Sequence, residues 1–205
     1  MEEEEMAKNY DKLMDEFQCF GDDAIFGLLY PFIDEGQEML DIGIGTGMSS
    51  IRFHQKGVTI DGVDISEPML SRCRSKKFTR NLLEHDLLDD KLPFEDSSYD
   101  HVIAAGVLHF FNDLDHIFKE VSRVLRKGGM FTLTVMADPD GGPEFGVETR
   151  MTKWNKEVNI HGRNYLENLA GKFGFKPISW LLFVGSIDPG TGELHYNWAF
   201  LLKLD

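Results

Sequence analysis

Three closely spaced glycines form the first pattern in this sequence that could bind a ligand. Gly43, Gly45 and Gly47 alternate with other residues directly behind a short apolar run at 38–42. Glycine is costly inside regular structure, so this cluster predicts a bend whose main chain something approaches closely. A tight turn with positive φ would explain one or two of these glycines, but not three. We therefore interpret 43–47 as a ligand-binding turn.

A dinucleotide is the first ligand that a glycine-rich turn suggests. Its fingerprint, G-x-G-x-x-G/A, places a small residue where the helix packs closely on the strand. This chain carries Met48 at that position, and the bulk of Met48 would obstruct the packing. The spacing therefore tells against NAD.

Acidic residues at the ends of predicted strands favour an adenosyl ligand with an amino-acid head. Asp64 can accept hydrogen bonds from two adjacent ribose hydroxyls, and Asp86 from an adenine amino group. Asp41 is placed to face an ammonium group. Three carboxylates would also repel a pyrophosphate. Each one alone could instead be a helix N-cap or a surface acid, Asp86 above all.

The elements that must position these residues alternate between strand and helix. Apolar runs predict strands at 38–42, 58–65, 81–88, 99–110 and 130–136. Helical spacing predicts helices at 47–57, 66–78 and 114–127, the last of them ended by Gly128 and Gly129. The alternation predicts an α/β fold with a Rossmann-like, doubly wound and mostly parallel sheet, and with helices on both faces.

The C-terminal part of the chain breaks this alternation. A predicted helix at 162–175 precedes two strand-like runs, 176–187 and 193–204, which only a short turn separates. Such a turn suits a hairpin and not a crossover, so we expect a seven-stranded sheet that ends in an antiparallel pair. Residues 137–161 are expected to form one long irregular segment. Two further helices are expected near 6–19 and 22–33.

Length, charge and composition limit the classes of function. The chain has 205 residues, of which 42% are hydrophobic, and a formal charge of −14. We expect one domain over 1–205, with 1–36 as an N-terminal helical cap and 137–161 as an insert. The acidic charge argues against a nucleic-acid partner. No apolar run approaches the length of a membrane span, and the acidic start is unlike a signal peptide.

The two cysteines give no sign of a structural framework. Cys19 and Cys73 are too few for a set of disulfides and lack metal-ligand spacing. We expect reduced thiols, no metal site and a cytoplasmic location. We also expect a monomer or a homodimer.

Four stretches together resemble a known family. They are "MLDIGIGTG" (39–47), "GVDISEPML" (62–70), residues 85–110 and "EVSRVLRKGGMFTLTV" (120–135). In this order, over 38–136, they resemble the class I S-adenosylmethionine-dependent methyltransferases of type 11/12. That group includes small-molecule enzymes of ubiquinone and menaquinone biosynthesis. The expected C-terminal hairpin also fits the sheet of that family.

The resemblance implies which residues contact S-adenosylmethionine and its product S-adenosylhomocysteine. The glycine turn would hold the methionine part, and Asp64 would bind the ribose. Tyr10, in a segment like the family's N-terminal lid, would close the pocket. The implied cofactor residues are Tyr10, Asp41, Gly43, Gly45, Thr46, Gly47, Asp64, Ile65, Met69, Asp86, Leu87, Ala104 and Ala105.

The reaction implied by the resemblance is an in-line displacement at the methyl group of a sulfonium. Alignment and exclusion of water would then be the main work of the protein. His109 is the candidate base for an acceptor that must lose a proton, although a histidine there can equally start a helix or fill the core. The candidate acceptor contacts are Phe110, Phe111, Phe145, Trp154 and His161. Each of these residues can instead simply cover the sheet.

Several acceptor classes can be compared from the sequence. Residues 104–107, Ala-Ala-Gly-Val, lack the motif of methylases that modify amino groups of DNA bases, and the chain has no Pro-Cys pair to attack a pyrimidine. This leaves a small molecule first and a protein second, with an O, N or C acceptor atom. Two alternatives stay open: a protein that binds S-adenosylmethionine without transferring methyl, and a nucleotide-dependent oxidoreductase.

Overall fold

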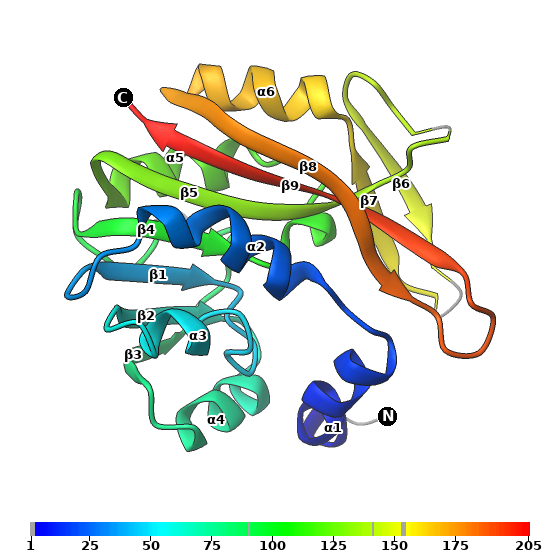
Figure 1. Ribbon diagram of the computed structural model, residues 1–205, viewed down its shortest axis with the longest axis horizontal. Helices are drawn as coiled ribbons and strands as arrows, with labels where there is room; N and C mark the ends of the chain where they lie inside the picture. Colours follow the sequence, from blue (N-terminus) through cyan, green and yellow to red (C-terminus); the bar gives the residue numbers. More distant parts are fainter. Residues whose placement is uncertain (1–2, 90, 141, 153–154) are drawn as a thin grey trace.

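Nine strands form one sheet in the computed structural model, which describes residues 3–89, 91–140, 142–152 and 155–205 (Figure 1). The strands are β1 (Glu38–Ile42), β2 (Thr59–Asp64), β3 (Thr79–Glu84), β4 (Tyr99–Ala104), β5 (Leu125–Ala137), β6 (Val147–Met151), β7 (Glu157–His161), β8 (Phe175–Ile187) and β9 (Leu194–Leu204). The helices are α1 (Glu3–Glu16), α2 (Gly21–Leu29), α3 (Ile51–His54), α4 (Glu67–Ser75), α5 (Asp115–Val124) and α6 (Arg163–Lys172), with short 3₁₀ helices η1 (Tyr30–Phe32) and η2 (Leu108–Phe110).

The order of the strands confirms the predicted architecture. β3, β2, β1, β4 and β5 lie side by side in this order and run parallel. β9 then pairs antiparallel with β5, and β8 pairs antiparallel with β9. The chain therefore has a Rossmann-like, mostly parallel sheet that ends in an antiparallel hairpin.

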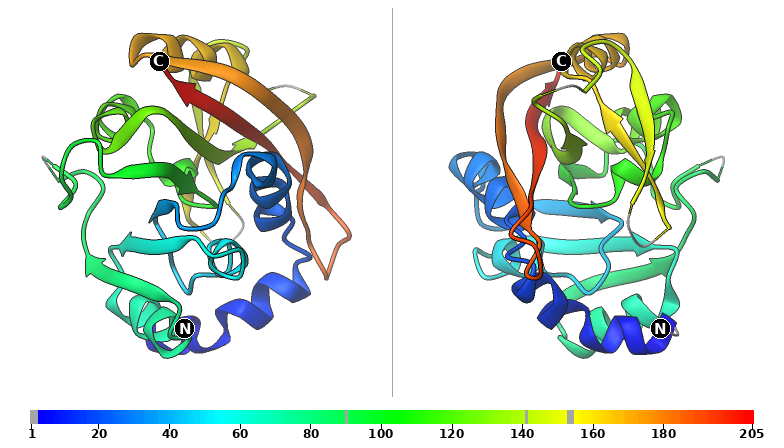
Figure 2. Two further views of the ribbon diagram at one scale, coloured as in Figure 1. Left: turned by 60° about the vertical axis from the view of Figure 1, so that its left-hand side comes forward. Right: turned by 90° about the vertical axis from the view of Figure 1, so that its right-hand side faces the viewer.

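Residues 137–161 differ from the irregular segment expected from the sequence, because β6 and β7 form an antiparallel hairpin there. β7 pairs with β5 through Ile160 and Met136, while β9 occupies the opposite edge of β5 at Met136. β7 therefore uses the edge of β5 that β4 leaves free beyond Ala104. In the right-hand view of Figure 2, this hairpin (yellow) and α2 (blue) lie on opposite sides of β9. The hairpin thus stands past the carboxyl end of β4, on the face opposite α2.

The helices divide between the two faces of the sheet as the sequence predicts. One buried cluster joins α2, α3 and α4 to the sheet and includes Ile25, Phe53 and Leu70. The other joins α5 and α6 to the opposite face and includes Phe118 and Leu166. No helix in the described ranges combines the length and the apolar character needed to cross a bilayer.

Several predicted elements are shorter in the structure. The helix expected over 47–57 is reduced to the single turn of α3, since residues 43–50 form the glycine turn and its exit. The helix expected over 114–127 ends at Val124, because Leu125 already pairs with Tyr99 in the sheet. The strand expected over 99–110 ends at Ala104, since Gly106 takes a φ of +67° and turns the chain toward η2.

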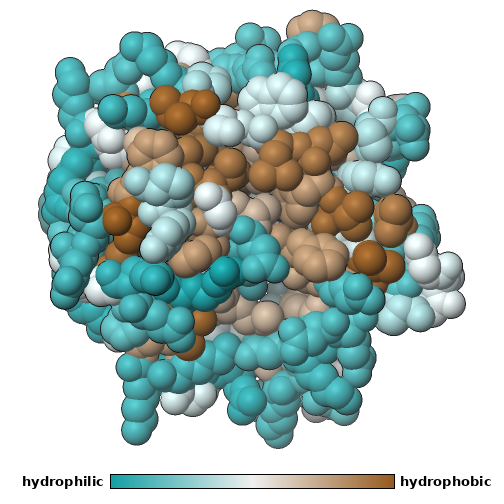
Figure 3. Space-filling model, in the orientation of Figure 1, coloured by the Kyte–Doolittle hydropathy of each residue, from teal (hydrophilic) through white to brown (hydrophobic). Residues whose placement is uncertain are grey.

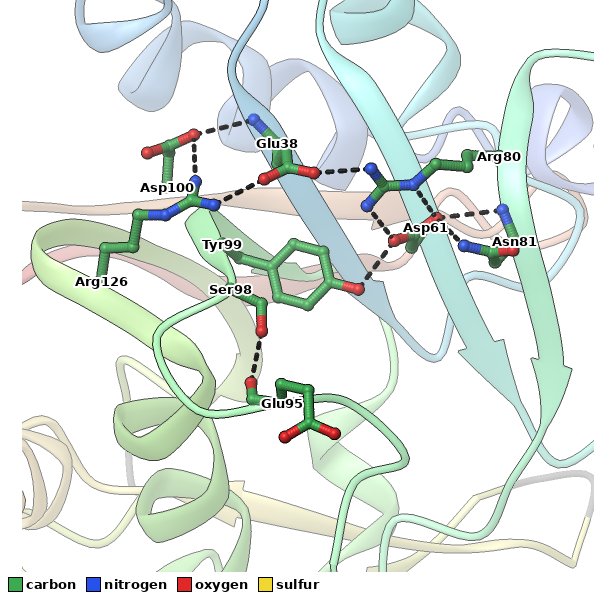
Figure 4. A network of polar contacts seen from close by, with 9 residues as sticks. All are labelled: Glu38, Asp61, Arg80, Asn81, Glu95, Ser98, Tyr99, Asp100 and Arg126. Atoms are coloured by element: carbon green, nitrogen blue, oxygen red, sulfur yellow. Dashed lines mark hydrogen bonds and ion pairs between the residues drawn. The ribbon is translucent and has the colours of Figure 1, made fainter.

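A buried carboxylate joins the amino ends of β2, β3 and β4 (Figure 4). Asp61 is 1% exposed and accepts hydrogen bonds from Nε and Nη2 of Arg80 at 3.0 and 2.5 Å. It also accepts from the main-chain N and Nδ2 of Asn81, both at 3.0 Å, and from the hydroxyl of Tyr99 at 2.8 Å. Burial raises the pKa of Asp61, but the bonds from Arg80 and Tyr99 outweigh it and leave the pKa below its ordinary value.

A second group of charges extends this network to β1 and β5 (Figure 4). Glu38 on β1 pairs with Arg80 Nη1 and with Arg126 Nη2, each at 2.6 Å. Arg126 also reaches Asp100 through Nη1 at 2.8 Å. Hydrogen-bonded carboxylate–guanidinium groups therefore fix the amino edge of the parallel strands, and this in turn fixes where their carboxyl ends lie.

We expect Tyr99→Phe to lower the free energy of unfolding by about 1.5–3 kcal/mol, because Asp61 would lose a hydrogen bond to a buried charge. Urea denaturation followed by circular dichroism measures this change. Tyr30→Phe is the matched control, since the Tyr30 side chain is exposed. Equal stability of the two variants would contradict the role given to the Tyr99 hydroxyl.

Candidate functional site

The glycine turn after β1 is shaped first by the packing of the chain itself. Gly43, Gly45 and Gly47 have φ values of +74°, +52° and +83°, which favour glycine at each position. A Cβ on Gly43 would lie 2.5 Å from Cγ2 of Val107, and one on Gly47 would lie 2.5 Å from Cζ of Phe78. Only Gly45 among the three faces open space. The argument that turn geometry explains at most two of these glycines is therefore wrong, because it explains all three.

Asp64, the last residue of β2, lies directly against this turn. Its Oδ2 accepts a hydrogen bond from the main-chain N of Gly45 at 2.8 Å, and its Oδ1 accepts from the N of Ser66 at 2.9 Å. Burial raises the pKa of this carboxyl, while the main-chain donors oppose the rise. Asp64 is thus held in a fixed orientation beside the open face of Gly45.

Asp41, near the end of β1, is a buried carboxyl with a single hydrogen-bond partner among the described residues. It is 1% exposed, and its Oδ2 accepts from the hydroxyl of Ser50. Burial raises the pKa of Asp41 to about 8, and the charges of Asp22 and Asp64 add to this rise. The charged form of Asp41 is therefore unfavourable here unless a cation lies beside it.

Asp22, in the first turn of α2, brings a third carboxyl to the same place. Its Oδ1 accepts from the hydroxyl of Ser49, the neighbour of Ser50 in the sequence. Burial raises the pKa of Asp22 and the negative charges of Asp23 and Asp11 add to the rise, while the Ser49 hydrogen bond and the charge of Arg52 oppose it. In the described part of the chain, no lysine or arginine makes a hydrogen bond or an ion pair with Asp22, Asp41 or Asp64.

Helix α1 covers these carboxyls from the side where the parallel strands end. Asp11 accepts from Oγ1 of Thr46 at 2.5 Å and pairs with Nζ of Lys76 at 2.6 Å. Burial raises the pKa of Tyr10 to about 12, and the nearby carboxylates of Asp22 and Asp64 contribute. Figure 3 shows the surface hollowed between α1 and the elements above it. Tyr10 therefore lies close to the turn, where the sequence places a lid.

The expected adenine contacts surround the ends of β2 and β3. Ile65 is an exposed apolar side chain directly after Asp64, and Met69 is half-buried on α4. Oδ1 of Asp86 accepts from the N of Leu88 at 2.9 Å, so this carboxylate stabilises its own turn. Leu87 packs into the core, and only its main chain is left to meet a ligand.

The expected methionyl contacts beside β4 are small and enclosed. Ala104 is fully buried at the end of the strand, and Ala105 is half-buried against the cluster under α2. The loop after β4 lies next to the glycine turn, because the side chain of Val107 fills the space beside Gly43.

His109, the candidate base, lies on η2 with its ring 4.2 Å from that of Phe110. Burial lowers the pKa of His109 to about 4, and the neighbouring His161 adds to the lowering. Its Nδ1 is buried and has no hydrogen-bond partner among the described residues. The imidazole is therefore neutral at physiological pH and only weakly basic.

The β6–β7 hairpin holds η2 in place. Nδ2 of Asn159 donates to the carbonyl oxygen of His109 at 3.1 Å, and Oδ1 of Asn159 accepts from Thr149 at 2.8 Å. His161 is buried, and its Nε2 lies 3.0 Å from the carbonyl oxygen of Phe111. A carbonyl only accepts, so Nε2 carries the hydrogen. Asn159 and His161 therefore support the loop that carries His109.

The remaining candidate acceptor residues are aromatic. Phe110 and Phe145 are exposed, at 57% and 68%. Phe111 is half-buried and packs against the core. Trp154 lies outside the described residues. The structure thus places two exposed aromatic rings in the segments η2 and 137–161 that the sequence assigns to the acceptor side.

Sequence reasoning missed Asp22, Ser49, Ser50 and Asn159. Asp22 is one of two adjacent acids at a helix start, where acids are favoured by the helix dipole alone. The serines follow the glycine turn in "MSS", and only their three-dimensional contacts reveal that each supports a carboxyl. Hydroxyl residues next to a ligand-binding turn are the one sequence signal that could have pointed to them.

Known proteins are similar to this chain in sequence. Residues 40–133 match the sequence profile described as "Methyltransferase domain". The chain is 27% identical over 141 residues to phosphatidylethanolamine N-methyltransferase of Cereibacter sphaeroides. The aligned residues make up 66% of this chain and 68% of the relative. It is 31% identical over 109 residues to demethylmenaquinone methyltransferase of Tropheryma whipplei (strain Twist), covering 52% of this chain but only 45% of the relative.

A solved structure shares the fold over nearly the whole chain. It is the 1,6-didemethyltoxoflavin-N1-methyltransferase of Burkholderia thailandensis, with bound 1,6-didemethyltoxoflavin and S-adenosylhomocysteine. The TM-score is 0.74 at 18% identity, and the match covers 99% of this chain and 87% of that one. Residues 40–133 thus match the profile of a methyltransferase domain, and the chain shares its fold with solved S-adenosylmethionine-dependent methyltransferases.

Proposed function

We propose that this chain transfers a methyl group from S-adenosylmethionine to a small-molecule acceptor. The observation that carries the proposal is the group of three carboxyls at the glycine turn and its exit, where Asp64 contacts Gly45 and where Asp22 and Asp41 contact Ser49 and Ser50. Their pKa values are all raised, and no described lysine or arginine pairs with them. A ligand with an ammonium and a sulfonium group would supply the missing positive charge. The match of residues 40–133 to a methyltransferase domain favours S-adenosylmethionine as that ligand.

The residues present fit this cofactor on structural grounds. Gly45 leaves its side-chain space open, and the Asp41 carboxyl is 1% exposed and hydrogen-bonded to the Ser50 hydroxyl. Asp64 is oriented by two main-chain donors and can accept from adjacent ribose hydroxyls. A pyrophosphate would be repelled by the same carboxyls, which disfavours the oxidoreductase alternative.

In this mechanism the cofactor supplies an activated methyl group, and the protein orients the reactants and excludes water from them. Asp64 and the glycine turn orient the ligand, and α1 with Tyr10 excludes water from it. The loop at Ala104–Val107 limits the space beside the methionyl part. His109 accepts a proton from the acceptor where the attacking group carries one, and its neutral state at pH 7 leaves it ready to do so.

A small-molecule acceptor is supported by the relatives and by the surface. The names of the three proteins compared above refer to phosphatidylethanolamine, demethylmenaquinone and 1,6-didemethyltoxoflavin, none of which is a macromolecule. The exposed rings of Phe110 and Phe145 suit an apolar or planar acceptor between η2 and the β6–β7 hairpin. We propose that 1–36 covers the cofactor side and 137–161 the acceptor side of one domain.

Turnover with methyl-labelled S-adenosylmethionine against fractionated metabolites tests this function. Label that moves into a small organic product supports methyl transfer. Tight binding of S-adenosylhomocysteine with no label transferred to any metabolite or protein fraction would favour a binding protein without transferase activity. Binding of NAD(H) in place of S-adenosylhomocysteine would contradict the proposal outright.

We expect Asp64→Ala to weaken cofactor binding by about 1–3 kcal/mol, or roughly 5- to 150-fold in Kd, because buried ribose hydroxyls would lose their acceptor. Calorimetry with S-adenosylhomocysteine measures the change. Asp89→Ala, an exposed acid on the loop after β3, is the control and should leave the Kd unchanged. An unaltered Kd in Asp64→Ala would remove Asp64 from the ribose site.

We expect His109→Gln to slow turnover by about 10²-fold, the low end of the range for loss of a general base because His109 is weakly basic, without changing the Kd of the cofactor. The pKa of about 4 means that His109 stays unprotonated throughout the neutral range. Its contribution should therefore persist as the pH falls and be lost only as the pH approaches that value. Full activity of the variant, or a rate that falls already near pH 6.5, would exclude His109 as the base.

A further inference from the structure

The outer edge of β8 is a stretch of main chain that pairs with no strand. In the described sheet, β8 pairs with β9 alone, and it borders the sheet on its outer side (left-hand view of Figure 2, orange). Phe20 N donates to the carbonyl oxygen of Gly185 at 2.9 Å, and Ile187 N donates to that of Phe17 at 2.8 Å. Within the described ranges, no other main-chain hydrogen bond reaches β8 from outside the β8–β9 pair.

The side chains along this edge are apolar, and many of them are exposed. Ile178, Trp180 and Leu182 are 47%, 42% and 37% exposed. Leu181 and Phe183, which alternate with them, are half-buried. Figure 3 shows hydrophobic side chains gathered along the line of β8. A free strand edge with exposed apolar side chains is a surface on which another chain can add a strand.

The other two edges of the described sheet carry charges in their middle, and β8 does not. β3 has the exposed Arg80 and Glu84, and β6 has Glu148 and Arg150. Residues 177–187 of β8 include no charged residue, although the chain has a formal charge of −14. Charged side chains commonly protect a free edge from pairing with another chain. The centre of β8 therefore lacks the protection that β3 and β6 have.

Two features limit the open part of this edge to residues 178–184. Pro177 precedes it and has no N–H group with which to continue a ladder. Gly185 follows it, and there residues 17–20 already occupy the outer side of the strand. The open part therefore has Leu181 at its centre.

The same stretch of a second copy fits this edge when the two strands run antiparallel. A two-fold axis at Leu181 places Trp180 opposite Leu182 of the second copy and Leu181 opposite its own equivalent. These pairs are apolar, and no two charges oppose each other anywhere in 178–184. Apolar pairs of this kind stabilise an antiparallel ladder.

We propose that two copies of this chain pair through residues 178–184 of β8 and form a homodimer with one continuous sheet. A two-fold contact uses the same edge of both copies, so that association closes at two and does not extend into fibres. The charge of −14 opposes the approach of two copies, and this repulsion is weakest where the surface carries no charge. The proposal is independent of the proposed function.

Light scattering coupled to gel filtration, over a wide range of protein concentration, tests the dimer. We expect the wild type to have twice the mass of one chain and Leu182→Lys to have the mass of one chain. The added ammonium would lie opposite Trp180 of the second copy, where the guanidinium of Arg163 is 4.6 Å from the ring. Leu194→Lys is the matched control, because Leu194 is an exposed leucine of the same hairpin outside 178–184, and it should remain dimeric.

A mixture of two variants tests whether the partner is a second copy in this register. Leu181→Glu and Leu181→Lys each place like charges directly opposite each other, so that each variant alone should be monomeric. In the mixture a carboxylate of one copy faces an ammonium of the other, and the dimer should return, most clearly at low salt. Circular dichroism checks that both variants are folded before they are mixed.

Each contrary result overturns a defined part of the proposal. A wild type that keeps the mass of one chain at the highest concentration would overturn the dimer. A dimeric Leu182→Lys, or an equal loss of dimer in Leu194→Lys, would remove the contact from 178–184. A mixture with no more dimer than its folded components would overturn pairing about Leu181. None of these results depends on binding of S-adenosylhomocysteine, which tests the proposed function separately.

Discussion

Desolvation of carboxyls that have no lysine or arginine partner among the described residues is the constraint on which the functional part of this structure depends. Asp22, Asp41 and Asp64 converge beside the glycine turn, where burial makes their charged forms costly and no described lysine or arginine pairs with them. Such a place is unfavourable in the free protein and becomes favourable when a positively charged ligand enters it. The unpaired carboxyls therefore favour binding of a positively charged ligand and disfavour binding of a pyrophosphate.

At the amino ends of the same strands, by contrast, the carboxylates are paired with arginines. There Asp61, Glu38 and Asp100 are all satisfied by Arg80 and Arg126, with the Tyr99 hydroxyl completing the shell of Asp61. This amino edge, in which each carboxylate has a guanidinium partner, holds the strands in register, so that their carboxyl ends can present unpaired carboxyls at fixed positions. Stability and binding are therefore divided between the two edges of the sheet.

The sequence predicted the parallel sheet, its antiparallel hairpin and the place of Asp64, because apolar runs and helical periodicity report directly on buried strands and helices. It missed Asp22, whose partner Ser49 lies 27 residues away, and no local pattern reveals such a contact. It also missed the β6–β7 hairpin, because Gly142 and Pro143 suggest a loop while β7 is stabilised by distant partners such as Phe111. The glycine argument failed because all three glycines take positive φ, and side chains from remote segments, Val107 and Phe78, lie where a Cβ on Gly43 or Gly47 would be.

A crystal structure of the chain with S-adenosylhomocysteine tests the central claim most directly. The account requires the ammonium group within hydrogen-bond distance of Asp41 and Asp22, and the ribose hydroxyls at Asp64, with the ligand passing the open face of Gly45. A ligand bound elsewhere, or one whose ammonium faces away from both carboxyls, would contradict the claim that uncompensated negative charge builds this site.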